Sequence, residues 1–205
     1  MQVAKNRDWI GLIAFYGFVW VGFLFLNTCS SDLPRFVDPK IKEQVNTCLD
    51  AFDGTNFNSL DLDRMVQIGT DAIEILREKI ESPQESTRWA AVMALAAIGH
   101  QLGERDQVLP YIQKAMEDAS ISVRVTAAEV ITSFGDKRGI LVLIDALDSD
   151  QVLRPSEPTT PIATQVLSIL KVYIGKDFQM ESKWRAWWEN NRDKIKWDSE
   201  SETFK

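Results

Sequence analysis

Ser122-Val-Arg-Val-Thr-Ala-Ala-Glu-Val-Ile-Thr-Ser-Phe-Gly-Asp136 is the stretch that decides the fold, because residues 88–99 carry the same pattern 36 positions earlier. Five positions match at this offset: Arg88 with Arg124, Ala91 with Ala127, Leu95 with Ile131, Ile98 with Phe134, and Gly99 with Gly135. A repeat of this length predicts a stacked helical solenoid, whose units bury their apolar faces against their neighbours. Such proteins present surfaces, so the repeat favours binding or scaffolding over catalysis.

Apolar spacing predicts three helical hairpins over residues 61–175. The first helix is expected to run from Asp61 until Pro83 stops it, and its partner from Ser86 to Ile98, closed by Gly99. The second hairpin is expected over about 107–118 and 120–134, with Gly135 as a left-handed cap. The third is interrupted by residues 148–160, a polar, proline-containing stretch that cannot continue either helix.

The pattern Val-Arg-x-x-Ala-x-x-x-Leu-x-x-Ile/Phe-Gly-Asp resembles the HEAT repeat, and is closest to the short bacterial form also found in phycobilin lyases. This resemblance implies an all-α fold, a short α-α superhelix of about three HEAT-like hairpins with capping helices. It also implies structural roles for Arg88, Gly99, Arg124 and Gly135. In such repeats the arginine pairs with an acidic residue of a neighbouring turn, so we expect Arg124 to pair with Asp118 or Glu117.

The segments around the repeats are predicted to connect and close them. Residues 29–39 read as a linker, and residues 40–60 as an N-terminal capping helix with Asp38 as its N-cap and Cys48 buried on its apolar side. Residues 176–197 read as a tryptophan-rich C-terminal capping helix. Residues 198–205 are expected to form a mobile polar tail.

Aromatic and basic residues near the C-terminus are the candidate protein-binding group. Tryptophan and arginine are enriched at the energetic centres of interfaces, and terminal repeats also need a cover, so both roles stay open. A basic helix that carries tryptophan can also lie on a lipid surface. The candidates are Trp184, Arg185, Trp187, Trp188 and Trp197, together with Leu153 and Arg154 of the stretch 148–160 that interrupts the third hairpin.

Residues 9–26 carry no charge and, as a helix, would be about 27 Å long, close to the hydrocarbon thickness of a bilayer. We therefore predict a transmembrane anchor within residues 1–28. Its aromatic residues are Trp9, Phe15, Tyr16, Phe18, Trp20, Phe23 and Phe25. Two alternatives stay open: a bacterial lipoprotein signal, because Leu26-Asn27-Thr28-Cys29 resembles a lipobox with Cys29 as the lipidated residue, and an ordinary cleaved signal peptide.

Composition narrows the class of function. The net charge of −7 argues against a nucleic-acid surface, and one His with two Cys argues against a zinc site. Phosphate-binding, nucleophile-elbow and zinc-protease motifs are not found, so we expect no enzyme, cofactor or metal.

The leading hypothesis is a membrane-anchored scaffold or adaptor, an accessory subunit of a bacterial membrane protein complex. It would sit in the cytoplasmic (inner) membrane as a single-pass protein, with its folded domain on the periplasmic side. The alternatives are a periplasmic or outer-membrane lipoprotein with the same protein-binding domain and, more remotely, a phycobilin-lyase-like enzyme.

Overall fold

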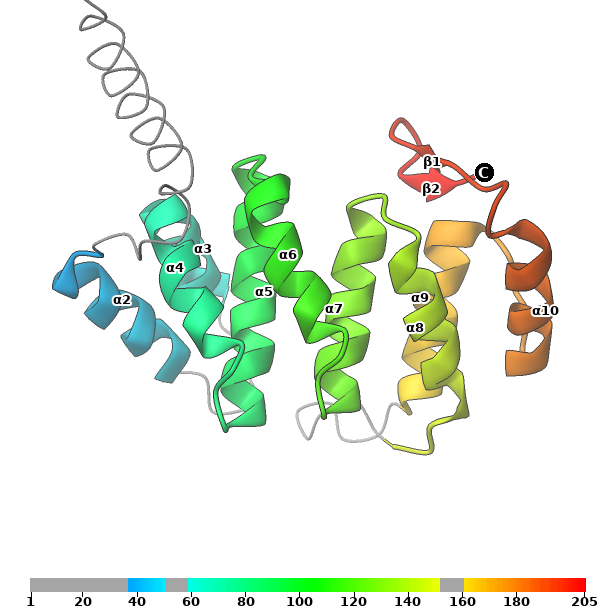
Figure 1. Cartoon of the computed structure of the whole chain (residues 1–205), viewed down its shortest axis with the longest axis horizontal. Coiled ribbons are helices and arrows are strands. Elements are labelled where there is room, and N and C mark those ends of the chain that lie inside the picture. The colour runs from blue at the N-terminus through cyan, green and yellow to red at the C-terminus, as the bar shows by residue number, and fades with distance from the viewer. Residues whose placement is uncertain (1–36, 51–58, 152–160) are drawn as a thin grey trace, which may run out of the picture. The chain divides into compact units, whose positions relative to one another are not determined.

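The computed structural model describes residues 37–50, 59–151 and 161–205, and this part of the chain is helical apart from one small sheet (Figure 1). The elements, in chain order, are α2 (Pro39–Asp50), α3 (Ser59–Ile68), α4 (Thr70–Lys79), α5 (Glu85–Gln101), α6 (Arg105–Ala115), α7 (Ile121–Ser133), α8 (Arg138–Asp145), the 3₁₀ helix η1 (Ala146–Asp148), α9 (Ile162–Ile174), α10 (Glu181–Asn191), β1 (Trp197–Asp198) and β2 (Thr203–Phe204). The two strands pair antiparallel.

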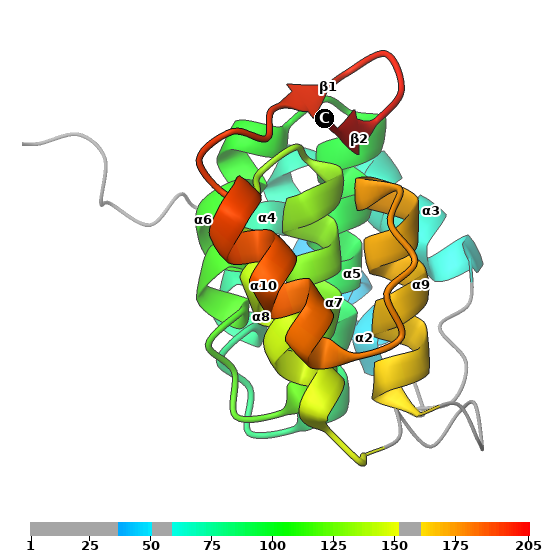
Figure 2. The same cartoon turned by 90° about the vertical axis from the view of Figure 1, so that its right-hand side faces the viewer.

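The helices of residues 37–205 stack in two layers, which Figures 1 and 2 show from two directions. Helices α3, α5, α7 and α9 pack side by side and form what we name the first layer. Helices α4, α6, α8 and α10 form the second layer, and each of α4, α6 and α8 also packs on the first-layer helix that follows it. The predicted hairpins are therefore present as α4–α5, α6–α7 and α8–α9, and the arrangement fits an α-α superhelix.

The apolar core consists of two clusters that meet at α7. Ala127 and Ile131 face the cluster on the N-terminal side, where Leu76, Leu95 and Ile112 are fully buried. Val125 and Ala128 face the C-terminal cluster, which includes Ile140, Leu143, Val166 and Trp184. Each buried side chain of this size stabilises the fold by about 1.5–3 kcal/mol relative to exposure. Because each repeat fills the space left by the next, the repeats hold one another in register.

The predicted single helix that starts at Asp61 is wrong. Gly69 has φ +74° and ψ −142°, a backbone conformation that glycine adopts readily because it has no β-carbon, and it divides the segment into α3 and α4. Helix α3 packs on α5 in the first layer, whereas α4 packs on α5 and α6 from the second layer. Apolar residues continue at helical spacing on both sides of Gly69, which is why the pattern alone did not reveal the break.

Two expectations about the ends have opposite outcomes. At the N-terminus the Lys40 amide donates to Asp38 Oδ1 at 2.9 Å, which confirms Asp38 as the cap of α2. At the C-terminus the predicted mobile tail is wrong, because β1 and β2 form a hairpin in which Phe204 is 5% exposed. Lys196 and Lys205 extend this hairpin through two backbone hydrogen bonds of 2.8 and 2.9 Å.

Within the ranges that the structure describes, no helix is long and apolar enough to cross a membrane. The predicted anchor at residues 9–26, with its aromatic residues and Cys29, lies outside those ranges. So do Leu153 and Arg154 of the interrupted segment.

Candidate functional site

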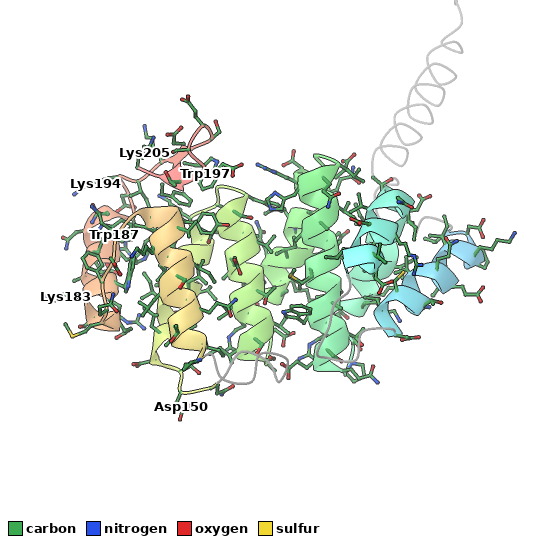
Figure 3. All side chains as sticks on the ribbon, turned by 180° about the vertical axis from the view of Figure 1, so that it is seen from behind. Asp150, Lys183, Trp187, Lys194, Trp197 and Lys205 are labelled. Atoms are coloured by element: carbon green, nitrogen blue, oxygen red, sulfur yellow. The ribbon has the colours of Figure 1, made fainter. Side chains whose placement is uncertain are left out.

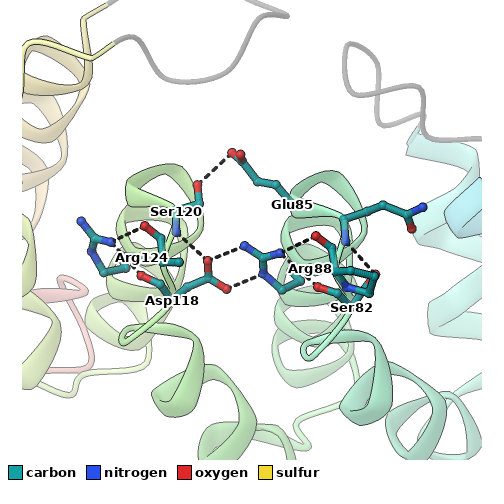
Figure 4. Close-up of polar contacts among 9 residues, drawn as sticks. Ser82, Glu85, Arg88, Asp118, Ser120 and Arg124 are labelled. Atoms are coloured by element: carbon teal, nitrogen blue, oxygen red, sulfur yellow. Dashed lines mark hydrogen bonds and ion pairs between the residues drawn. The ribbon is translucent and has the colours of Figure 1, made fainter.

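A paired arginine and aspartate connect successive repeats (Figure 4). Arg88, in the first turn of α5, donates from Nε and Nη2 to the two carboxylate oxygens of Asp118 at 2.6 and 2.8 Å. Arg88 Nη1 donates to the Ser82 carbonyl at 3.0 Å, so one guanidinium binds both its own turn and the next one. Burial alone would raise the pKa of Asp118, but hydrogen bonds from Arg88 and the Ser120 amide outweigh it and lower that pKa.

Arg124 occupies the equivalent position one repeat later, yet its expected ion pair is not formed. Its Nη1 donates to the backbone carbonyls of Asp118 and Ala119 at 2.7 and 3.0 Å. The Asp118 carboxylate forms its ion pair with Arg88 instead (Figure 4). The pairing runs forward along the array, from the arginine of one repeat to the acid of the next. The expectation was wrong because it placed both partners in the same repeat.

The two repeated glycines, Gly99 and Gly135, have different structural roles. Gly135 has φ +86°, and the Asp136 and Gly135 amides donate to the carbonyls of Ile131 and Thr132, which confirms the predicted left-handed cap of α7. Gly99 was expected to close its helix, but α5 continues to Gln101 and Gly99 is buried within it. A β-carbon at Gly99 would lie 2.8 Å from both Phe134 and Val108, so this glycine permits close packing between helices.

The candidate binding tryptophans divide between core and surface. Trp184 and Trp188 are 0% and 6% exposed, and the Trp184 indole donates to the Phe178 carbonyl at 2.9 Å, so these two cover the end of the array. Trp187 on α10 and Trp197 on β1 are half-buried and lie on separate elements (Figure 3). Arg185 is exposed and pairs with Asp145 at 2.8 Å.

A row of side-chain polar contacts joins α5 and α7 in the first layer. The Trp89 indole of α5 donates to Thr126 Oγ1 of α7 at 2.9 Å. Further along the same two helices, His100 Nε2 lies 3.0 Å from Ser133 Oγ. Glu129 stands on α7 between Thr126 and Ser133, and neither an ion pair nor a hydrogen bond joins it to another of the described residues.

Sequence reasoning missed Glu129, although the repeat carries a signal for it. The 36-residue offset matches Glu129 with Met93, and the 39-residue offset between α7 and α9 matches it with Ser168. A carboxylate therefore stands where α5 has the half-buried apolar side chain of Met93 and α9 has the exposed hydroxyl of Ser168.

Cys48 is 4% exposed, which confirms it as a buried thiol, and burial raises its pKa above the ordinary value. It borders a cavity of about 710 Å³ between α2 and α3, together with Ile41, Thr47, Arg64 and Gln67. A raised pKa keeps the thiol protonated at neutral pH, so Cys48 is not an activated nucleophile. No group of three or more His, Cys, Asp or Glu that could hold a metal occurs among the residues described.

Comparison with known proteins supports the repeat class. No curated protein matches the chain. The family described as HEAT repeats matches residues 73–156, which run from α4 through η1 into the interrupted segment. The match is to HEAT repeats in general and gives no support to the phycobilin-lyase form. Residues 73–156 are thus similar to HEAT repeats, which generally mediate protein–protein interaction.

Proposed function

We propose that this chain is a membrane-tethered scaffold that binds a protein partner through its helical array, as an accessory subunit of a bacterial membrane complex. The observation that carries the proposal is the HEAT-repeat match over residues 73–156, whose helices stack in two continuous layers. Arrays of this kind present long surfaces to other proteins. The proposed role of the chain is to bind its partner, and no catalytic step is assigned to it.

The tether in this proposal is the uncharged stretch at residues 9–26. Its length suits a bilayer, and the proposal places the folded domain on the periplasmic side of the inner membrane. The second candidate is a lipoprotein of the same binding function, which the lipobox-like Leu26-Asn27-Thr28-Cys29 favours.

The intact mass of the protein isolated from membranes distinguishes the two tethers. A chain that retains residues 1–28 without added lipid supports the transmembrane anchor. A chain that begins at a diacylated Cys29 contradicts the anchor and establishes the lipoprotein.

The scaffold function is tested by purifying the tagged full chain from gently solubilised membranes. We expect it to migrate with one partner complex in fixed stoichiometry. Ser168 is an exposed residue of α9 in the first layer, and Ser168→Arg places a large cation there that should release the partner. Ser182 is an exposed residue of α10, and Ser182→Arg is the matched control. A wild-type chain that migrates alone contradicts the proposed function.

A further inference from the structure

Glu129 differs from the other buried and half-buried acids of the described residues in having no partner among them. Each of the others is neutralised or hydrogen-bonded: Asp61 by Arg64, Glu74 by Arg77, Glu104 by Gln107, Asp118 by Arg88, Asp136 by Arg138, Glu181 by Arg185 and Asp198 by Lys205. Burial raises the pKa of Glu129, and no cation among the described residues offsets that rise. A carboxylate removed from water without a counter-charge destabilises the fold that holds it.

Glu129 is one of the few residues of α7 that are not buried. In α7 only Ile121, Arg124, Glu129 and Ser133 escape burial, so Glu129 and Ser133 form a narrow surface strip along the second half of the helix. The Ser133 hydroxyl donates to the Val130 carbonyl at 2.7 Å, and its oxygen is left to accept from His100. Tyr173 of α9 also hydrogen-bonds Ser133, so Glu129 is the residue of this strip without a hydrogen bond to another of the described residues.

The surroundings of Glu129 favour a cation. On α9, burial and the negative charge of Glu129 raise the pKa of Tyr173, a hydrogen bond with Ser133 lowers it in part, and the charge of Glu202 in the β1–β2 turn adds a smaller rise. The ring of Trp197 is half-buried, with its centroid 6.4 Å from that of Tyr173. Aromatic faces attract Lys and Arg, particularly where water is partly excluded. Arg105 of α6 lies over the Phe134 ring, with its guanidinium carbon 5.3 Å from the ring centroid.

We propose that Glu129 is the docking point for a Lys or Arg side chain of a protein partner that lies across the first layer. This inference rests on the proposed scaffold function and names the chemistry of its partner: a basic segment, whose cation supplies the charge that none of the described residues provides to Glu129. The equivalent positions Met93 on α5 and Ser168 on α9 provide uncharged neighbours in the same row, so one cation is recognised at one place.

Thermal unfolding of the full chain gives the first test, and it needs no partner. Glu129→Gln keeps the shape of the side chain and removes its unpaired charge. We expect the unfolding midpoint at pH 7 to rise by about 2–4 °C, the shift that corresponds to a modest gain in a protein of this size. Glu117→Gln removes one charge from an exposed turn residue and should leave the midpoint unchanged. A midpoint that falls or stays constant in Glu129→Gln contradicts an uncompensated carboxylate.

The second test uses a fluorescent tetra-arginine peptide at 150 mM salt, with the isosteric but neutral tetra-citrulline peptide as control. Glu129→Gln should weaken binding of the arginine peptide about tenfold or more relative to Glu117→Gln, which has the same net charge. His100 is the chain's one histidine, so its NMR signal should move when the peptide binds. Equal affinity of the two variants, or equal binding of citrulline, overturns the inference.

The outcomes separate this inference from the scaffold function on which it rests. A partner that co-purifies equally with wild type and Glu129→Gln overturns the docking role of Glu129 and leaves the scaffold intact. A wild-type chain that carries no partner contradicts the scaffold, whatever the peptide result.

Discussion

Replacing Arg88 with methionine should destabilise the domain far more than the same change at Arg124. Arg88→Met keeps the unbranched stem and removes the guanidinium, which leaves Asp118 without its cation. The side chains of Arg88 and Asp118 are only 15% and 7% exposed, and their contact is bidentate. The change therefore strands a carboxylate away from water.

The size of the effect follows from that burial. An exposed ion pair contributes about 0–1 kcal/mol, whereas removing one partner of a buried pair costs about 3–5 kcal/mol. The Ser120 amide still donates to Asp118 Oδ1 at 2.7 Å in the variant, which offsets part of the loss. We expect a loss of about 3 kcal/mol, at the lower end of the range for buried pairs.

Arg124→Met is the matched control, because it removes contacts to the carbonyls of Asp118 and Ala119 but strands no carboxylate among the described residues. Its expected cost is about 1 kcal/mol. Urea unfolding of the full chain, followed by tryptophan fluorescence, measures both variants under the same conditions.

The difference between wild type and Arg88→Met should also depend on pH. The lowered pKa of Asp118 means that its stabilising contribution is present above the ordinary pKa of an aspartate and is lost as pH falls through the lowered value. The two proteins should therefore converge in strong acid. Equal losses in Arg88→Met and Arg124→Met at neutral pH would refute the forward pairing of the repeats.

Three further changes test other parts of the fold. Gly139→Ala should lower the melting temperature, because a β-carbon would collide with the Ala128 carbonyl and cost about 1–3 kcal/mol; an unchanged melting curve would argue against this close packing of α7 and α8. Phe204→Ala should lower the free energy of unfolding in urea by about 3 kcal/mol, since Phe204 is 5% exposed, and a tail that is dispensable for stability would show no change. Burial, with a smaller effect of Arg105, lowers the pKa of His100, so its NMR signal should titrate below the ordinary value and stability should rise with pH across that window. Titration at or above the ordinary value would place His100 in a different environment, and His100→Gln should remove the pH dependence.

The repeat made the layered array predictable, because a shared offset between apolar positions dictates which faces each helix must bury. Local signals were also sufficient for the Asp38 cap and the Gly135 turn, where one residue type suits one backbone geometry. The HEAT-repeat match over residues 73–156 agrees with this part of the reasoning.

Other features depended on contacts between distant segments. Gly69 divides a continuous apolar pattern, and whether such a glycine bends or continues a helix depends on what packs at either side. By sequence, Gly99 is typical of a helix end. In the structure, a glycine is needed there because Phe134 packs too close to leave room for a β-carbon. The hairpin at the C-terminus forms because Trp197 packs on Gly135 and Phe204, a contact that polar composition conceals.

The candidate site was predicted less completely than the fold. Composition directed attention to the tryptophans, and two of them, Trp184 and Trp188, prove to be core residues. Glu129 was overlooked because a single acid in a helix is ordinary by sequence. Its significance comes from burial and from the absence of a counter-charge among the described residues, which only the packing of α7 against α9 reveals.

Site-specific photo-crosslinking in cells tests the central claim, that the first layer binds a protein partner, most directly. A photoreactive phenylalanine analogue in place of the exposed Ser168 of α9 should crosslink the full chain to one protein. The same analogue in place of the exposed Ser182 of α10 should give no crosslink. Crosslinks that are absent at 168, or equal at both positions, would contradict the claim.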